Sequence, residues 1–179
     1  LFVNKFIYGV RIPFTEKRIL RLKDIQRGDI VVFRFPTDDP KEEHCGSSQY
    51  GKDFIKRVIG LPGDTVELRG GRVFINGQAG PPEPFAQYLD TGRMERFSGP
   101  FVAGEYQTLW QERRLDKRLG DAMRDEFGPI SVPAGAYFVM GDNRDRSCDG
   151  RYWGPVQKKY LKGKAWVIYW PPGRMGRIS

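Results

Sequence analysis

The stretch DFIKRVIG, Asp53 to Gly60, has the alternation of a β-strand and carries two adjacent cations. Because successive side chains of a strand point to opposite faces, Lys56 shares one face with Phe54 and Val58. Arg57 lies on the other face, with the two isoleucines of the stretch. The two cations therefore point in opposite directions, and each has apolar neighbours on its own face.

The sequence around this stretch predicts short strands joined by turns. GDIVVFRFP, residues 28–36, is a β-branched apolar run ended by proline, which is typical of a buried strand. The polar segment over residues 37–53 is expected to be an exposed loop. Residues 65–69 and 72–75 are expected to form a hairpin, because Gly70 and Gly71 between them supply the positive φ angles that a two-residue loop needs.

The two ends of the chain have strand character, whereas the middle does not. Residues 130–142 and 162–170 are apolar and β-forming, while apolar residues at helical spacing over 106–123 predict an amphipathic helix. We predict a mainly β fold, in which antiparallel sheets form a coiled, barrel-like core and a smaller subdomain with a hairpin and a helix is inserted into it. The predicted boundaries are 1–66 and 130–179 for the core and 67–129 for the subdomain.

Composition limits the classes of function without choosing one. The net charge of +8 attracts anions, which include nucleic acid, acidic lipid head groups and counterions. The longest apolar run, residues 165–170, is far shorter than the ~20 residues that cross a bilayer. The two cysteines and the single histidine lack the spacing of metal ligands. The stretch GLPGDT lacks the Gly-Lys-Ser/Thr ending of a mononucleotide-binding loop. We therefore expect neither a metal nor a cofactor.

Lys56 has two interpretations. A charged ammonium loses several kcal/mol of solvation on burial, so a lysine inside an apolar strand can extend its amine to solvent or pair with an acid. Alternatively, burial lowers its pKa from about 10.4 towards neutrality, and the uncharged amine acts as a general base. The strand alone leaves both interpretations open.

A second stretch bears on this choice. Together with MGDNRDRSCDGRYWGPV, residues 140–156, the stretch KRVIGLPGD resembles two motifs of the bacterial type I signal peptidases, and RGDIVVFRFP resembles a third. The motifs occur in the order and at the spacing of that family, and only residues 81 to about 124 lack a good match. The family consists of membrane-anchored serine endopeptidases with a Ser/Lys dyad. The resemblance implies that this protein removes signal peptides from secreted proteins after small residues of the Ala-x-Ala type.

The resemblance also implies roles for single residues. Lys56 matches the general base, and Ser147 matches the hydroxyl that hydrogen-bonds and orients the lysine amine. Asp149 and Arg151 match an ion pair beneath the site. The charged stretch over residues 140–156 would therefore hold Lys56 neutral and correctly aimed.

Four further residues would support this arrangement. Arg57 would pair with Asp142 and so fasten the strand of Lys56 to the GDNR turn. Phe54 and Ile55 match the part of the strand that lines the substrate groove in the family. Without the resemblance, Arg57 and Asp142 would each be interpreted as an ordinary surface charge.

The sequence also departs from the family. The family's nucleophile lies in a Ser-Met-x-Pro-Thr motif a short distance upstream of the segment that resembles residues 1–9, and no such motif occurs here. We expect the nucleophilic serine, its oxyanion-hole donors and the membrane anchor to precede residue 1, and the chain alone to be inactive. A second departure is Gly150, where the family usually has serine.

The cysteines are the third departure. Cys148 follows Ser147 directly, and the family's catalytic domains lie on the outer, periplasmic face of the bacterial cytoplasmic membrane, where disulfides persist. A bridge from Cys148 to Cys45 would tie the loop over residues 37–53 to the site. Since a sequence does not supply the Cα separation that a disulfide requires, two free thiols are the default expectation.

The implied partners are signal peptides of secretory preproteins and the lipid surface, where aromatic and basic side chains are well placed. No nucleic acid is expected. Two alternatives remain: a family member that has lost catalysis and serves as a scaffold, and a basic β-barrel module that binds nucleic acid. The second alternative explains the charge but gives no reason for a lysine within an apolar strand.

Overall fold

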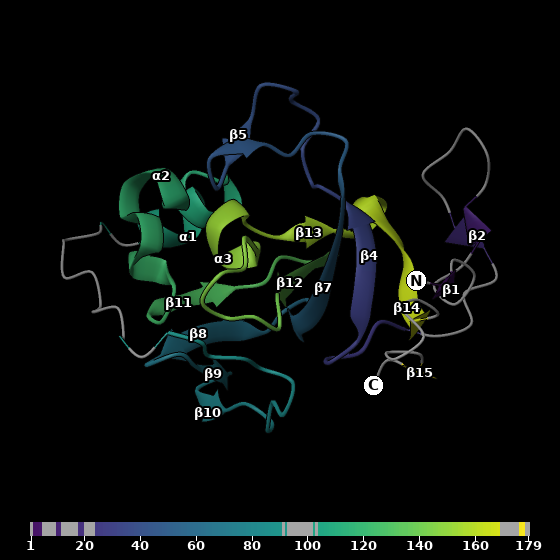
Figure 1. The fold of residues 1–179 in the computed structure, drawn as a ribbon. Helices are drawn as coiled ribbons and strands as arrows, with labels where there is room; N and C mark the ends of the chain where they lie inside the picture. Colours follow the sequence, from purple (N-terminus) through teal and green to yellow (C-terminus); the bar gives the residue numbers. More distant parts are fainter. Residues whose placement is uncertain are drawn as a thin grey trace.

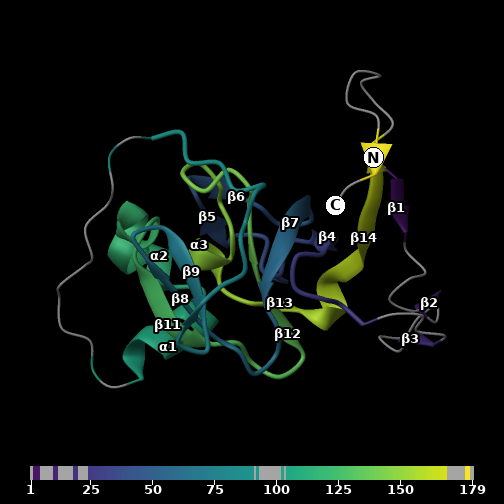
Figure 2. The ribbon, with the colours of Figure 1, turned by 90° about the horizontal axis from the view of Figure 1, so that it is seen from below.

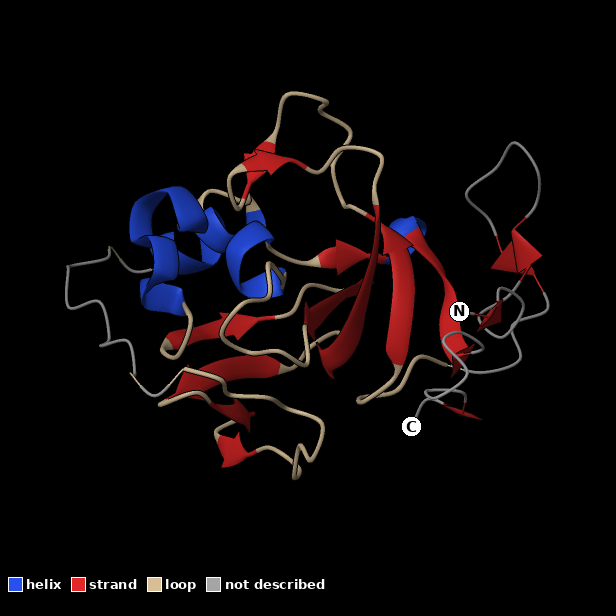
Figure 3. Ribbon diagram, in the orientation of Figure 1, coloured by secondary structure: helices blue, strands red, loops and turns tan. Residues whose placement is uncertain are grey.

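The computed structural model describes residues 2–4, 10–11, 18–19, 24–90, 92, 102, 104–168 and 176–177. In these residues two antiparallel sheets lie side by side, with helices α1, α2 and α3 gathered over the smaller one (Figure 1). Figure 3 shows that strands and loops make up most of this part of the chain. The predicted mainly β fold is therefore confirmed.

The larger sheet has the strand order β1-β14-β4-β7-β12-β13, with β15 paired to β14. Its two ends, β1 and β13, are not joined, so within the described residues this sheet is open and is not the closed barrel that a barrel-like core suggests. The strands are β1 (Phe2–Asn4), β4 (Ile30–Arg34), β7 (Asp53–Gly60), β12 (Ala136–Met140), β13 (Val156–Gln157), β14 (Leu161–Ile168) and β15 (Gly176–Arg177).

The smaller sheet has the order β10-β9-β8-β11. Its strands are β8 (Thr65–Arg69), β9 (Arg72–Ile75), β10 (Gln78–Ala79) and β11 (Phe127–Ser131). The predicted hairpin is confirmed: Gly70 and Gly71 have φ angles of 55° and 78° in the turn between β8 and β9. Two further pairs of short strands are β2 (Val10–Arg11) with β3 (Arg18–Ile19), and β5 (Glu43–His44) with β6 (Ser47–Ser48).

The single helix predicted over residues 106–123 is wrong, because the chain forms three short pieces there. They are α1 (Glu105–Gln111), α2 (Leu115–Leu119) and the 3₁₀ helix η1 (Gly120–Met123). α1 ends because Arg113 has a φ of 60°, and the Arg114 amide then donates back to the Leu109 carbonyl at 2.8 Å, which is a Schellman stop. The break turns the chain so that Trp110 and Leu115 are both fully buried. The other helices are α3 (Gly150–Trp153) and the 3₁₀ helix η2 (Lys158–Tyr160).

The segment expected to be an exposed loop, residues 37–53, is only partly so. It contains the β5–β6 hairpin, and His44, Thr37 and Gln49 are buried in it. Polar composition predicted exposure, but these polar groups have hydrogen-bond partners, which offset the free-energy cost of burying them.

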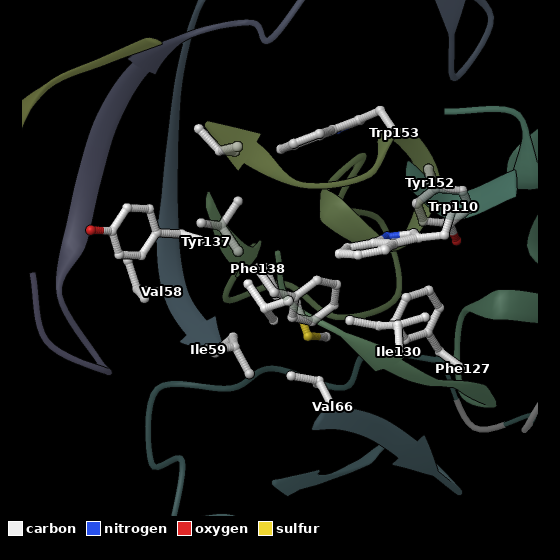
Figure 4. Close-up of a cluster of buried hydrophobic side chains, with 14 of the residues drawn as sticks. Val58, Ile59, Val66, Trp110, Phe127, Ile130, Tyr137, Phe138, Tyr152 and Trp153 are labelled. Atoms are coloured by element: carbon white, nitrogen blue, oxygen red, sulfur yellow. The ribbon is translucent and has the colours of Figure 1, made fainter. Parts of the chain in front are cut away.

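One cluster of buried apolar side chains runs through both sheets. Phe138 of β12 stacks on Phe127 of β11 with ring centroids 5.3 Å apart, and Trp110 of α1 lies 6.1 Å from Phe138. Figure 4 shows these rings between the strands of the two sheets, and Figure 2 shows β7 and β12 between the helical side and β14. Because this cluster includes residues of both sheets, it marks no boundary between them, and the division into a core and an inserted subdomain stays a prediction.

None of the helices in the described residues is long and apolar enough to cross a lipid bilayer.

Candidate functional site

Lys56 lies in the middle of the larger sheet, on β7, with Val31 of β4 opposite it. Its amine donates a hydrogen bond to the Ser147 hydroxyl, with 2.7 Å between Nζ and Oγ. Burial lowers the pKa of the Lys56 amine, and this effect exceeds the opposing effect of the Asp149 carboxylate. The structure therefore brings together the two residues that the resemblance paired, and it places a lysine of lowered pKa against a hydroxyl.

The approach of Ser147 to Lys56 depends on Gly141, the first residue after β12. A Cβ atom at this position would lie 2.1 Å from Ser147 Oγ and 3.4 Å from Lys56 Nζ. The Gly141 amide donates to Asp149 Oδ2 at 3.0 Å. The turn after β12 therefore has a glycine where the hydroxyl of Ser147 needs the space.

Asp149 and Arg151 form the ion pair predicted beneath the site. Arg151 donates from Nε to Asp149 Oδ1 and from Nη2 to Oδ2, both at 2.9 Å, and both side chains are fully buried. Burial alone would raise the pKa of Asp149, but the Arg151 guanidinium outweighs it and holds that pKa below its usual value. Arg151 also donates to the carbonyls of Arg124 and Arg144, at 2.6 and 2.7 Å. This pair therefore joins the loop of Ser147 to the residues before β11.

Arg57 and Asp142 also form the predicted pair. Arg57 Nε and Nη2 donate to the two carboxylate oxygens of Asp142, each at 2.9 Å. A third nitrogen, Nη1, donates to the Gly28 carbonyl at 3.0 Å, and the ring of Phe85 lies 3.5 Å from the guanidinium carbon. Lys56 and Arg57 thus lie on opposite faces of β7, and they contact Ser147 and Asp142 of the same loop after β12.

Phe54 and Ile55 differ in their surroundings. Phe54 packs its ring against Phe35 and Trp153, at centroid distances of 5.3 and 6.4 Å, so most of its contacts are with the core. Ile55 is 49% exposed. β12 pairs with β7 only from Arg57 to Gly60, and in the described residues no other strand pairs with that edge of β7 before Arg57. Ile55 therefore lies beside an open strand edge that ends at Lys56.

The expectation of two free thiols needs correction. Cys45 and Cys148 are joined by a disulfide with a Cα separation of 6.1 Å, so the default of two free thiols was wrong. In the GDNR turn, Arg144 Nε donates to the Gly141 carbonyl at 3.2 Å, and Asn143 Oδ1 accepts from the Arg146 amide at 3.2 Å. At Gly150 a Cβ would lie 2.7 Å from the Val139 carbonyl, so a larger residue there requires a shift of β12.

Sequence analysis missed one group of charged residues near the site. His44 is buried between Asp116 of α2, 2.7 Å from Nδ1, and Glu42, 2.7 Å from Nε2. Burial would lower the pKa of His44, but the hydrogen bonds to the two carboxylates outweigh it and raise that pKa. A cleft of about 620 Å³ reaches Ser147 and is lined by residues of this hairpin, of α2 and of the Ser147 loop. His44 connects the hairpin to α2 through Asp116, and the disulfide of Cys45 connects it to Cys148, next to Ser147.

Comparisons with known proteins show the family of this chain. The family described as "Signal peptidase, peptidase S26" matches residues 1–170. The chain is similar to a "Signal peptidase I" of Pseudomonas fluorescens, with 36% identity over 99% of this chain and 61% of that protein. It is also similar to a "Signal peptidase I" of Leptolyngbya laminosa, with 38% identity over 92% of this chain and 63% of that protein. The chain thus spans less than two thirds of either relative.

A solved structure supports the same relation. The crystal structure of a signal peptidase I from Enterococcus faecalis V583 aligns with a TM-score of 0.50 and 28% identity, over 80% of this chain and 97% of the other. The family match covers nearly the whole sequence, and the paired Lys56 and Ser147 lie in the motifs that carried the resemblance. The chain belongs to the signal peptidase family, peptidase S26.

Proposed function

We propose that this protein is a membrane-associated serine endopeptidase that removes signal peptides from secretory preproteins with a Ser/Lys dyad. The observation that carries the proposal is the Lys56 amine, which lies in an apolar strand 2.7 Å from Ser147 Oγ and has a lowered pKa. A surface lysine that pairs with an acid would have its charged form stabilised instead. The family membership supports the same activity.

In the proposed mechanism, neutral Lys56 is the general base. The amine donates one N–H to Ser147, so its lone pair stays available to a second hydroxyl. That hydroxyl belongs to a nucleophilic serine, which we place in the part of the protein that precedes residue 1. Lys56 takes its proton, and the serine oxygen attacks the scissile carbonyl. Protonated Lys56 then gives that proton to the leaving amine as the C–N bond breaks, which leaves a serine ester and a neutral Lys56. Lys56 next takes a proton from the water that hydrolyses the ester and returns it to the serine oxygen as the ester C–O bond breaks, and no metal or cofactor takes part.

The substrate would bind along the open edge of β7. An extended peptide can add to an exposed strand edge through main-chain hydrogen bonds, with its side chains in alternate pockets. Ile55 presents its half-exposed side chain at this edge, next to Lys56, so it would contact the residues before the cut. Phe54 would shape the groove from below. We propose that small residues, typically alanines, occupy the first and third positions before the cut.

We place the catalytic domain on the outer face of the bacterial cytoplasmic membrane. The net charge of +8 favours contact with anionic head groups there. A disulfide next to Ser147 also fits an oxidising compartment, because cytosolic proteins are kept reduced.

The decisive experiment is cleavage of a preprotein with an Ala-x-Ala site by the protein extended upstream to include the proposed serine. We expect cleavage that rises with pH as Lys56 loses its proton and that is lost in Lys56→Ala. Unchanged cleavage by Lys56→Ala would refute the proposed base. Absence of cleavage by the extended wild-type protein, with folding intact, would leave a non-catalytic scaffold.

A further inference from the structure

Residues 83–90 lie in the proline-rich part of the chain and contain no named helix or strand, yet they contact the site closely. The Gln87 amide donates to the Asp142 carbonyl at 2.7 Å, and the Arg144 amide donates back to the Gln87 carbonyl at 2.9 Å. The Leu89 and Asp90 amides both donate to Asp145 Oδ2. This segment, which we call the brace, therefore follows the turn over residues 141–145 for its whole length.

Glu83 connects the brace to Ser147 through two residues. Its carboxylate accepts two hydrogen bonds from the Arg144 guanidinium, at 2.6 and 2.9 Å, and Arg144 is 2% exposed. The same guanidinium donates from Nε to the Gly141 carbonyl at 3.2 Å. Gly141 is the residue against which Ser147 Oγ packs. Glu83 thus fixes the orientation of an arginine that holds the peptide beside Ser147.

Phe85 connects the brace to the residue after Lys56. Its ring covers the Arg57 guanidinium at 3.5 Å, and Arg57 binds Asp142 with two hydrogen bonds. A ring over a guanidinium stabilises its charge and fixes its plane. Glu83 and Phe85 therefore act on the same turn, Glu83 through Arg144 and Phe85 through Arg57.

The brace has other contacts besides those with the turn. The Tyr88 hydroxyl donates to the Gly71 carbonyl at 2.8 Å, and Arg124 donates to the Asp90 carboxylate at 2.9 Å. Glu83 and Phe85 line a cavity of about 180 Å³ together with Val58 and Ile75. The contacts of Glu83 and Phe85 with arginines therefore hold this end of the brace against the turn.

We infer that the brace positions Lys56 and Ser147 for catalysis, with Glu83 and Phe85 as its positioning residues. This inference rests on the proposed function. Neither residue touches the amine, so each acts through an arginine: Glu83 through Arg144 and Phe85 through Arg57. When either contact is lost, the turn loosens, water reaches the Lys56 amine, and less of it is neutral at a given pH.

The test compares Glu83→Gln, Phe85→Leu and Phe85→Tyr in the protein that includes the upstream serine. Glu83→Gln keeps the shape but leaves Arg144 a weaker partner, and Phe85→Leu removes the ring. We expect kcat to fall about tenfold in both, because small misplacements of reacting groups are costly. KM should not change, since the β7 edge is untouched, and the rising limb of the pH profile should move to higher pH. Phe85→Tyr keeps the ring and should behave as wild type.

Two controls separate the inference from the proposed function. Glu112→Gln removes an exposed glutamate whose ion pair in the described part of the chain is with Arg114, and it should change nothing. The pKa of Lys56 is also measured without catalysis, from the pH dependence of its acetylation rate in wild type and variants. A wild-type protein that does not cleave refutes the proposed function, whereas the acetylation experiment still tests the brace.

The inference is overturned if Glu83→Gln and Phe85→Leu both keep the wild-type kcat, pH limb and Lys56 acetylation profile. It is also overturned if they lower only the melting temperature, because a purely structural role has that effect. If Glu83→Gln does not fold, Phe85→Leu decides alone.

Discussion

At the scale of single residues, Gly141 is the position where the site has least room. A methyl group there would overlap Ser147 Oγ, 2.1 Å away, and would reach within 3.4 Å of Lys56 Nζ. We expect Gly141→Ala to lower kcat about 100-fold, because a displacement of about 1 Å in a catalytic group has effects of that size. Cleavage kinetics measure this. Gly92→Ala is the control, since nothing in the described part of the chain lies within 4 Å of a Cβ there. Equal rates in the two variants would show that the position of Ser147 does not matter.

The lowered pKa of Lys56 should also change how the free energy of unfolding depends on pH. Its pKa in the folded protein is lower than the value of about 10.4 in an unfolded chain. Between these two pKa values the unfolded state binds more protons, so the free energy of unfolding rises with pH. We expect Lys56→Met to lack this rise and to be more stable than wild type at pH 7. Urea unfolding of both proteins from pH 7 to 11 tests this, and parallel curves would mean that Lys56 has an ordinary pKa.

Residue alternation was sufficient to place Lys56 and Arg57 on opposite faces of one strand, as the structure has them. It could not supply their partners, because Ser147 is 91 residues from Lys56 and Asp142 is 85 residues from Arg57. Only the resemblance to a family brought those partners into the prediction. Glu83, 61 residues from Arg144, lies where the resemblance fails, and no local pattern marks it.

At the scale of elements, the β5–β6 hairpin depends on the disulfide. Cys45 and Cys148 close a loop with a sequence separation of 103 residues, and such a crosslink restricts the unfolded chain. We expect Cys45→Ser with Cys148→Ser to lower the free energy of unfolding by about 4 kcal/mol. Denaturant unfolding of this double variant and of reduced wild type measures the effect, and the two should agree. Stability equal to that of oxidised wild type would refute the stabilising role.

The same hairpin depends on His44 at its other side. We expect His44→Phe to lower the free energy of unfolding by about 3 kcal/mol at low pH, because it leaves the partly buried carboxylates of Asp116 and Glu42 beside an apolar ring. The His44 pKa is raised in the folded protein, so its stabilisation is complete below its ordinary pKa of about 6.5 and is lost as pH rises through the folded value. The difference between wild type and His44→Phe should shrink over that range. A difference that stays constant with pH would mean that His44 is not charged in the folded protein.

Elements were predicted well where local chemistry decides them and poorly where packing does. Gly70 and Gly71 set the β8–β9 turn by themselves. The helix over residues 106–123 has the right periodicity, but the positive φ of Arg113 ends α1, and the two pieces bury Trp110 and Leu115 separately. An arginine in that conformation has no sequence signature, because glycine or asparagine usually occupies such a position.

At the scale of the whole molecule, the prediction of an inserted subdomain raises the question whether its sheet unfolds by itself. Phe138 of the larger sheet is fully buried and stacks on Phe127 of the smaller sheet, and Trp110 of α1 contacts both rings. Arg151 adds a polar link from the Ser147 loop to the Arg124 carbonyl. We therefore expect the two sheets to unfold in one transition.

Phe138→Ala tests this coupling. Deletion of a buried phenylalanine ring costs about 3–5 kcal/mol. If the sheets form one cooperative unit, the variant loses that free energy equally in both, and amide hydrogen exchange accelerates by the same factor in β7 and in β8. Ile55→Ala is the matched control, because its half-exposed side chain lies on β7 and contributes little to the core. Faster exchange confined to β12 and its neighbours in the larger sheet would show instead that residues 67–129 form a separate folding unit, as the sequence boundaries suggest.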